Sequence, residues 1–336
     1  MTALATKSDG RLRMAVIGCG PIGRLHAQAI EASNRASLLA VCDPDVERRT
    51  AMAERFRAAA YANARQLLAE QPLDAVTIAT PDHLHVEPAL AAIEAGCHVF
   101  CEKPLAGRVD EAERLVRAAA ERGVHLAVDY NRRFAFGYRT AKQQLDQGSI
   151  GKLDYVALRV SDRTPRAEVA RGDAHVMFTT LLTHHFDLMR YYGGEIRRLH
   201  ALAGDEPAGE LMRNVTLSLQ FANGPIGAIV AGYRDGQTRT AEWLELGGTT
   251  GSLVVEDMTR RVILSGADPD RREVFEPNSF GAGGAFYDSL IEHVHAFIEH
   301  VGQGQPPPVT GRDGLIGMQW AAAAVESLRS GGMVEV

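Results

Sequence analysis

The sequence predicts an α/β protein in which a doubly wound parallel sheet is followed by an α+β domain with a large, mostly antiparallel, open-faced sheet. The chain has 336 residues, more than one hydrophobic core usually organises, so we expect two domains. Its first part alternates short apolar runs with helical patterns. Its later part contains consecutive strand-like segments separated by glycine-containing turns.

The first part has the pattern of a buried parallel sheet. Nearly continuous apolar runs predict strands at residues 13–17, 38–42, 74–79, 98–101 and 124–128. Helical patterns join them at residues 22–33, 86–95 and 109–122. Strands that are apolar on both faces and connected by helices are typical of a sheet covered on both sides. We therefore expect one domain at residues 12–128, after a loose arm at residues 1–11.

The second part, residues 129–330, indicates an α+β domain. Helices are predicted at residues 136–147, 177–192, 286–301 and 315–329, the last of which closes the chain. Strands are predicted at residues 153–161, 215–221, 226–233, 241–246, 252–257 and 261–265. Successive strands joined by short turns favour antiparallel pairing.

Composition excludes several classes of protein. Apolar residues make up 46% and charged residues 23%, which is ordinary for a globular chain and argues against disorder or a fibrous repeat. The net charge of −6 gives no electrostatic reason to bind nucleic acid or a membrane surface. No apolar run approaches the roughly 18–20 residues of a membrane helix, and residues 1–13 lack the apolar segment of a secretory signal.

The cysteines predict neither disulfides nor a metal centre. They are Cys19, Cys42, Cys97 and Cys101, and no two of them form a C-x-x-C pair. Cysteines inside apolar strand-like runs behave as small buried hydrophobes, which favours a reduced, cytoplasmic location. The spacing of the histidines around residues 175–185 is also poor for a metal on one helix, so we expect no metal.

A glycine-rich motif follows the first predicted strand and opens the first predicted helix. It consists of Gly18, Cys19, Gly20, Pro21, Ile22 and Gly23. A G-x-G-x-x-G sequence in this context is the fingerprint of dinucleotide-binding Rossmann domains. Gly18 permits a tight turn, Gly20 lets the backbone approach a pyrophosphate, and Gly23 allows close helix–strand packing.

An acidic residue closes the second predicted strand. Asp43 lies 20 residues beyond Gly23, the separation expected for the residue that binds the adenosine ribose. Its carboxylate would accept hydrogen bonds from the ribose hydroxyls and repel a 2′-phosphate, so we expect NAD as the cofactor. NADP is the less favoured alternative, which the neighbouring Arg48 and Arg49 leave open.

The sequence Glu102-Lys103-Pro104 follows the fourth of these predicted strands. It therefore lies at the carboxyl edge of the parallel sheet, where open α/β folds bind their ligands. A lysine there can donate a hydrogen bond to a substrate oxygen and favour negative charge on it. The spacing alone leaves open a surface lysine beside a glutamate.

These segments resemble the Gfo/Idh/MocA oxidoreductases, a family that includes glucose–fructose oxidoreductase and inositol dehydrogenase. The resemblance is specific up to residue 134 and looser over the rest of residues 13–330. It is carried by residues 15–23 (AVIGCGPIG), 79–85 (ATPDHLH), 92–106 (AIEAGCHVFCEKPLA) and 130–134 (YNRRF). It implies an NAD(P)-dependent dehydrogenase of sugars, inositols and related cyclic polyols, with Lys103 as the catalytic lysine. It also implies dimers or tetramers assembled through the second sheet.

The resemblance further implies roles for other residues. Thr80, Pro81 and Glu102 would line the cofactor site with His85 close by. Tyr130 and Arg132 would stand near the substrate.

The second-domain helix carries a departure from the family pattern. The family usually has an aspartate and a histidine four residues apart, and here the corresponding residues are Thr180 and His184. On an α-helix, Thr180, His184 and Asp187 share one face. His184 is suited to accept a hydroxyl proton, but a threonine can only orient it. The resemblance favours a structural role for Asp187.

Together these features predict reversible hydride transfer between a nicotinamide and a secondary alcohol. His184 would take the hydroxyl proton, and Lys103 would hold the oxygen or carry the proton itself. Thr180 would complete a polar pocket for a polyhydroxylated substrate. The alternatives are an NAD-dependent glycosidase-type hydrolase of the same family, a non-catalytic NAD-binding regulator, and a protein that only assembles subunits.

Overall fold

A computed structural model describes residues 10–165, 176–204, 211–238, 240–268, 270–277 and 285–336. The chain forms two compact units. The first consists of the described residues up to Asn131 together with Leu290–Ile316, and the second of Arg132–Ser289 and Gly317–Val336. Among the described residues, no helix is both long enough and apolar enough to cross a membrane.

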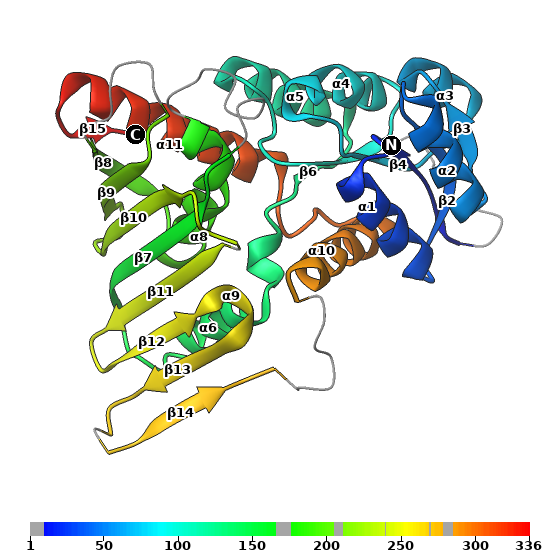
Figure 1. The fold of residues 1–336 in the computed structure, drawn as a ribbon. Helices are drawn as coiled ribbons and strands as arrows, with labels where there is room; N and C mark the ends of the chain where they lie inside the picture. Colours follow the sequence, from blue (N-terminus) through cyan, green and yellow to red (C-terminus); the bar gives the residue numbers. More distant parts are fainter. Residues whose placement is uncertain (1–9, 166–175, 205–210, 239, 269, 278–284) are drawn as a thin grey trace. The chain divides into compact units, whose positions relative to one another are not determined.

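The first unit is built on a six-stranded parallel sheet (Figure 1). The strand order is β3-β2-β1-β4-β5-β6, so the direction of winding reverses between β1 and β4. The strands are β1 (Leu12–Ile17), β2 (Ala36–Cys42), β3 (Ala59–Tyr61), β4 (Ala75–Ile78), β5 (His98–Cys101) and β6 (Leu126–Val128). In an open parallel sheet, this reversal is where ligands bind, outside the carboxyl ends of the strands. The predicted doubly wound sheet is confirmed.

Helices connect these strands and supply the rest of the core. They are α1 (Pro21–Ala32), α2 (Val46–Phe56), α3 (Ala64–Glu70), the 3-10 turn η1 (Asp82–Leu84), α4 (Val86–Glu94) and α5 (Val109–Arg122). Two of these helices, α2 and α3, and the short strand β3 were not among the predicted elements. Strand β3 has only three residues, too few to show a period, and two of them are exposed.

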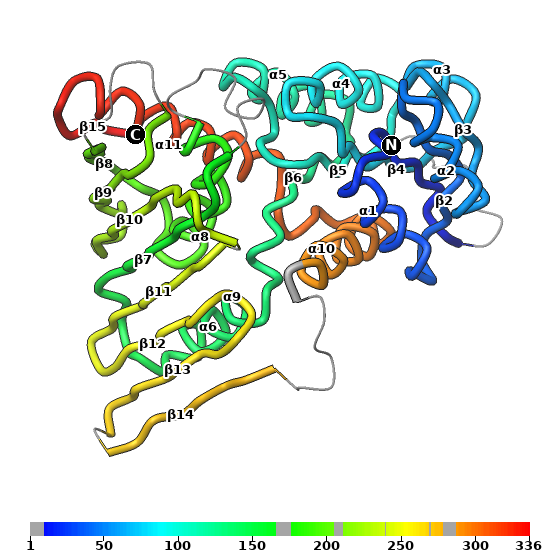
Figure 2. The backbone as a smooth tube through the Cα atoms, in the orientation of Figure 1, coloured from blue at the N-terminus to red at the C-terminus, as the bar shows by residue number. Residues whose placement is uncertain are grey.

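Helix α10 (Ala285–Gly302) packs mainly in the first unit although it comes late in the chain. Its apolar residues Leu290, Val294 and Phe297 belong to the same buried cluster as Val16 and Phe100. Helix α10 lies beside α1 (Figure 2), and the His295 Nε2–H donates to the carbonyl of Ala29 at 2.8 Å. The sequence-based division placed this segment in the second domain, because residues that are neighbours in the chain usually share a core.

The second unit contains a nine-stranded mixed sheet in the order β14-β13-β12-β11-β7-β10-β9-β8-β15. Strands β7 and β10 pair in parallel, and the other pairs are antiparallel, as predicted for most of the sheet. The strands are β7 (Leu153–Arg163), β8 (Ile196–Ala203), β9 (Asn214–Phe221), β10 (Ile226–Arg234), β11 (Ala241–Gly248), β12 (Gly251–Glu256), β13 (Arg261–Ser265), β14 (Arg272–Phe275) and β15 (Val334–Glu335). Strands β8, β14 and β15 were not predicted.

One face of this sheet is exposed along its central strands. In β10, Gly227 and Ile229 are buried, whereas Ile226 and Val230 on the opposite face are exposed. Helices of this unit are α6 (Phe136–Asp146), α8 (Thr183–Gly193), the single turn α9 (Asp257–Arg260) and the part of α11 (Gly311–Ser330) that begins at Gly317. The 3-10 turn η2 (Asn131–Phe134) leads into this unit. Helix α8 packs on β7 and β10, which explains their alternating burial.

The predicted α-helix at residues 177–192 is interrupted. Met177–Leu181 form a π-helical turn, in which the N–H of Leu182 donates to the carbonyl of Met177 at 2.8 Å, and α8 begins only at Thr183. The Thr179 hydroxyl donates to the carbonyl of Val176 at 3.3 Å, a local bond that competes with α-helical pairing. The four-residue spacing from Thr180 to His184 therefore crosses this junction and does not follow an α-helical face.

Candidate functional site

The glycine-rich loop joins β1 to α1 and leaves open space at one position. A Cβ on Gly18 would stand 2.5 Å from the carbonyl carbon of Ala79, and its φ of +103° favours glycine. A Cβ on Gly23 would stand 1.8 Å from the carbonyl oxygen of Gly18. A Cβ on Gly20, by contrast, would meet nothing within 4 Å. Two glycines thus allow close packing, and the third borders the open space that a pyrophosphate would need at the N-terminus of α1.

Asp43 is held rigidly beside this loop. Its Oδ2 accepts a hydrogen bond from the backbone N–H of Cys19 at 2.8 Å, and its Oδ1 accepts one from the backbone N–H of Asp45 at 2.9 Å. The residue is 7% exposed. Each carboxylate oxygen has a second lone pair, so the oriented group can still accept hydrogen bonds from two ribose hydroxyls.

The two arginines near Asp43 have local partners. The Arg49 guanidinium donates to the carbonyls of Asp43 and Pro44 at 3.4 and 2.9 Å. Arg48 lies 3.5 Å from the Asp45 carboxylate in an exposed ion pair. These contacts favour Asp43 as the group that determines recognition of the ribose.

A pocket of about 290 Å³ opens at the carboxyl ends of β1, β2 and β4. Residues from the glycine-rich loop, from the end of β2, from the turn before α3 and from the Thr80 loop line it, including Gly18, Cys42, Pro44, Asn63, Thr80 and Leu84. The pocket adjoins the glycine-rich loop and the residue that follows Asp43, where the adenosine half of a dinucleotide would lie. The residues present therefore fit the expected cofactor.

Burial keeps the thiols near this pocket unreactive. Burial, and after it the charge of Asp43, raises the pKa of Cys19 to about 12. The same two causes raise the pKa of Cys42 to about 11. Both thiols are therefore protonated at neutral pH and contribute apolar surface.

His85 ties the two loops that follow β4 and β5. It is 1% exposed, and its Nδ1 and Nε2 lie 2.8 and 3.0 Å from the carbonyl oxygens of Pro104 and Thr80. The side chain therefore holds the Thr80 and Glu102-Lys103-Pro104 loops together beneath the surface. This places His85 close to the predicted cofactor loops, as a brace between them.

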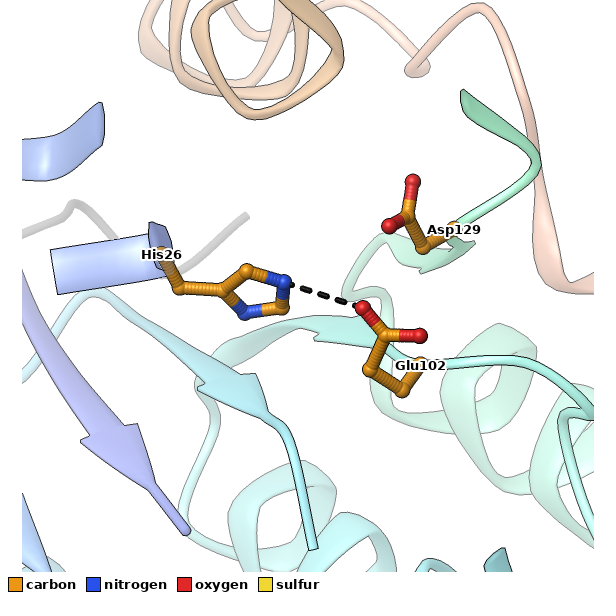
Figure 3. A group of neighbouring side chains, drawn as sticks. All are labelled: His26, Glu102 and Asp129. Carbon is orange, nitrogen blue, oxygen red and sulfur yellow. Dashed lines mark hydrogen bonds and ion pairs between the residues drawn. The ribbon is translucent and has the colours of Figure 1, made fainter. Parts of the chain in front are cut away.

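Glu102 is held at the end of β5 by contacts on both carboxylate oxygens. The His26 Nε2–H donates to its Oε1 at 3.1 Å (Figure 3), and the backbone N–H of Lys103 donates to its Oε2 at 3.3 Å. Burial alone would raise the pKa of Glu102. The hydrogen bond from His26 and the charge of Lys103 outweigh burial and lower it.

Two further residues at this place were missed by sequence reasoning. Asp129 follows β6 and is 2% exposed, and the His293 Nδ1–H from α10 donates to its Oδ1 at 2.7 Å. His293 is fully buried. An acid directly after a strand of the same sheet edge was a usable signal for Asp129, whereas His293 is brought there by the fold alone.

The predicted site residues of the second unit lie on and before α8. His184 is 6% exposed, and Thr180 is partly buried in the π-helical turn. Asp187 forms an ion pair with Arg133, whose Nε donates to Oδ2 at 2.8 Å. The Arg133 guanidinium also lies 5.1 Å from the centre of the Tyr191 ring. These contacts support the structural role expected for Asp187.

Arg132 forms a buried ion pair with Glu242. Its Nε and Nη2 donate to Glu242 Oε1 at 2.9 and 2.6 Å, and the exposed fraction of the residue is 5%. The Tyr138 hydroxyl donates to the other oxygen of Glu242, and His185 Nε2 lies 3.2 Å from the first. Burial would raise the pKa of Glu242, but the charges of Arg132 and His185 lower it well below its usual range. The Arg132 guanidinium is therefore engaged by Glu242, and the substrate contact expected of it stays a prediction. Tyr130 is fully buried.

Comparisons with known proteins agree with this geometry. The model of an oxidoreductase family with an NAD-binding Rossmann fold matches residues 12–130, and its C-terminal alpha/beta domain matches residues 142–336. The chain is 28% identical over 337 residues to a myo-inositol 2-dehydrogenase of Thermotoga maritima, covering 94% of this chain and 96% of the relative. It is 29% identical over 346 residues to a scyllo-inositol 2-dehydrogenase (NAD(+)) of Bacillus subtilis, covering 98% and 97%.

Solved structures share the fold. A levoglucosan dehydrogenase in complex with NADH and levoglucosan superposes with a TM-score of 0.86. The match covers 97% of this chain and 99% of the other, at 24% sequence identity. At that identity the likeness establishes the fold alone.

Proposed function

Because the chain belongs to the Gfo/Idh/MocA oxidoreductase family, we propose that it oxidises a secondary alcohol of an inositol, sugar or related cyclic polyol, with NAD as the acceptor. The observation that carries this proposal is the glycine-rich loop with open space at Gly20, together with Asp43 fixed beside it. Full-length relatives named as inositol dehydrogenases support the substrate class.

Residues of the first unit bind and orient the reactants. Gly18, Gly20 and Gly23 would accommodate the pyrophosphate, and Asp43 would accept hydrogen bonds from the ribose. When bound, NAD supplies the nicotinamide ring that accepts a hydride. Lys103 donates a hydrogen bond to the substrate oxygen and stabilises the negative charge that develops there during oxidation.

His184 is proposed as the base for the hydroxyl proton, at one of its ring nitrogens. Thr180 replaces the carboxylate of the family pattern, so it adds no negative charge that would stabilise the protonated ring. The protonated ring is therefore less stabilised than with a carboxylate at this position, which makes His184 a weaker base. The alternative is that Lys103 carries the proton, and the pH–rate profile of His184→Ala described below distinguishes the two.

The proposal is tested by NADH formation with a panel of inositols, monosaccharides and anhydrosugars. Net formation of NADH with at least one of them is expected, and Lys103→Met is expected to slow it about 10²–10³-fold while NADH still binds. Release of sugar from a glycoside without net NADH would indicate the hydrolase alternative. Binding of NADH with neither reaction across the panel would indicate a non-catalytic regulator. A flat pH–rate profile in His184→Ala, relative to the unaltered protein, would assign the proton to His184.

We also propose a cytoplasmic, homo-oligomeric protein. The four cysteines are buried free thiols, which suits a reducing compartment. The exposed apolar residues Ile226 and Val230 on the open face of the second-unit sheet suit a subunit interface. A molar mass of two or four chains in light scattering would support this, and a monomer at micromolar concentration would contradict it.

A further inference from the structure

Four polar side chains, of which all but Glu102 are buried, meet beneath the carboxyl edge of the first-unit sheet. We call them the buried relay: His26 of α1, Glu102 after β5, Asp129 after β6 and His293 of α10. His26 and His293 are fully buried, and both rings pack edge-on against Phe100, at centroid distances of 5.4 and 4.9 Å. Figure 3 shows the His26 ring and the Glu102 and Asp129 carboxylates converging on one space.

The two carboxyl groups of the relay are direct neighbours. An oxygen of each carboxyl group and a ring nitrogen of His26 all lie within 4.8 Å of one another. A carboxylate can only accept hydrogen bonds, so two carboxyl groups this close can bond to each other only when one of them is protonated. Two adjacent buried negative charges would also repel strongly.

The surrounding donors decide which carboxyl group keeps the negative charge. Glu102 receives hydrogen bonds from the His26 ring and from the backbone N–H of Lys103, and the charge of Lys103 acts on it as well. Asp129 receives the ring N–H of His293. We propose that the buried relay holds one proton on Asp129, so that Glu102 stays ionised beside Lys103 and positions its ammonium group.

The other titratable group facing the relay is consistent with this arrangement. Burial, and after it the charge of Glu102, raises the pKa of Cys101 well above its usual value. The thiol stays protonated and adds no second negative charge. Asp129 and His293 are therefore positioning residues, which act on Lys103 through Glu102.

The test uses asparagine as the uncharged isostere of a protonated aspartate. In Asp129→Asn, the new amide oxygen would accept from His293 and the amide N–H would donate to Glu102, so this variant should retain the relay. Asp129→Ala should raise the unfolding equilibrium constant about tenfold more than Asp129→Asn does, since a charged group loses a hydrogen bond. Equal losses in the two variants would mean that Asp129 carries a charge, and would overturn the proposal.

Asp74 provides a matched control in the same unit. It is also buried, but it forms an ion pair with Arg13 at 2.9 Å, so its carboxylate must be ionised. Asp74→Asn should therefore destabilise nearly as much as Asp74→Ala does. The test compares the difference in stability between the asparagine and alanine variants at Asp129 with the same difference at Asp74.

Two measurements probe the relay without any substrate. Histidine ¹⁵N NMR should show the Nε2–H tautomer for His26 and the Nδ1–H tautomer for His293. Metal analysis of the purified protein should find no stoichiometric divalent cation, because a cation bound by His26, Glu102 and Asp129 would displace the shared proton. The other tautomers, or a retained metal, would contradict the inference.

The catalytic consequence rests on the proposed function and is measured separately. With an active substrate, Asp129→Ala should lower kcat about tenfold and shift the pH–rate profile, Asp129→Asn should rescue both, and Asp74→Ala should leave the profile in place. If no polyol is oxidised, the proposed function fails while the stability and NMR results still decide the relay. An unshifted profile in Asp129→Ala would remove its positioning role.

Discussion

Alanine at Gly20 and at Gly23 is expected to damage the protein in two different ways. A Cβ at Gly23 would lie 1.8 Å from the carbonyl oxygen of Gly18, so the backbone must yield by about 1.2 Å to reach the 3.0 Å that real Cβ atoms keep. Such overpacking against backbone costs about 3 kcal/mol or more. For a unit of this size, that lowers Tm by roughly 6–12 °C.

At Gly20 the same methyl group meets no atom of the protein within 4 Å. Its φ of −72° and ψ of −173° suit alanine, so Gly20→Ala should change the stability by no more than about 1 kcal/mol. The methyl group would instead occupy the space proposed for the pyrophosphate. We expect NADH affinity to fall at least about tenfold, which corresponds to about 1.4 kcal/mol.

The assay pairs thermal unfolding with a fluorescence titration of NADH on both variants. Gly20→Ala should keep its Tm and lose affinity, and Gly23→Ala should lose Tm even without ligand. Gly123→Ala, at the C-terminal end of α5, controls for a general effect of replacing glycine, and it should keep its NADH affinity. Full NADH affinity in Gly20→Ala would refute the assignment of this loop to the pyrophosphate.

Four further outcomes are expected. Glu242→Gln leaves the buried Arg132 charge unpaired and should cost about 3–5 kcal/mol in denaturant unfolding; a loss below about 1 kcal/mol would contradict the ion-pair geometry. The pKa of Glu242 is lowered in the folded state. Its contribution to the free energy of unfolding is therefore complete above the unfolded-state pKa of 4.5 and is lost as the pH falls below that value. If the stability of Glu242→Gln fell with acid as much as that of the unaltered protein, the result would contradict this account. Lys103→Met should reduce turnover about 10²–10³-fold with NADH binding retained, and Asp43→Ser should raise the NADP-to-NAD preference about tenfold or more, each measured by steady-state kinetics.

The nucleotide-binding half was predictable because its signals are local. A buried strand, a glycine-rich turn and an acid after the next strand each depend on neighbouring residues, and the structure places Gly18, Gly23 and Asp43 as the sequence indicated. The parallel sheet follows for the same reason, since strands that are apolar on both faces need cover on both sides.

Long-range partners were not predictable from one sequence. Glu242 lies 110 residues from Arg132, and no local pattern marks either as half of a buried ion pair. Likewise, His293 reaches Asp129 across 164 residues because α10 returns to the first unit. The π-helical turn before α8 was missed because the apolar period of residues 177–192 fits an α-helix equally well.

The most direct test of the central claim follows one hydrogen atom. A cyclic polyol that the protein oxidises is labelled with deuterium on the carbon bearing the reacting hydroxyl, and the cofactor is recovered for mass spectrometry. We expect NADH to contain one deuterium, transferred from that carbon. Oxidised polyol accompanied by unlabelled NADH would contradict direct hydride transfer, and with it the proposed mechanism.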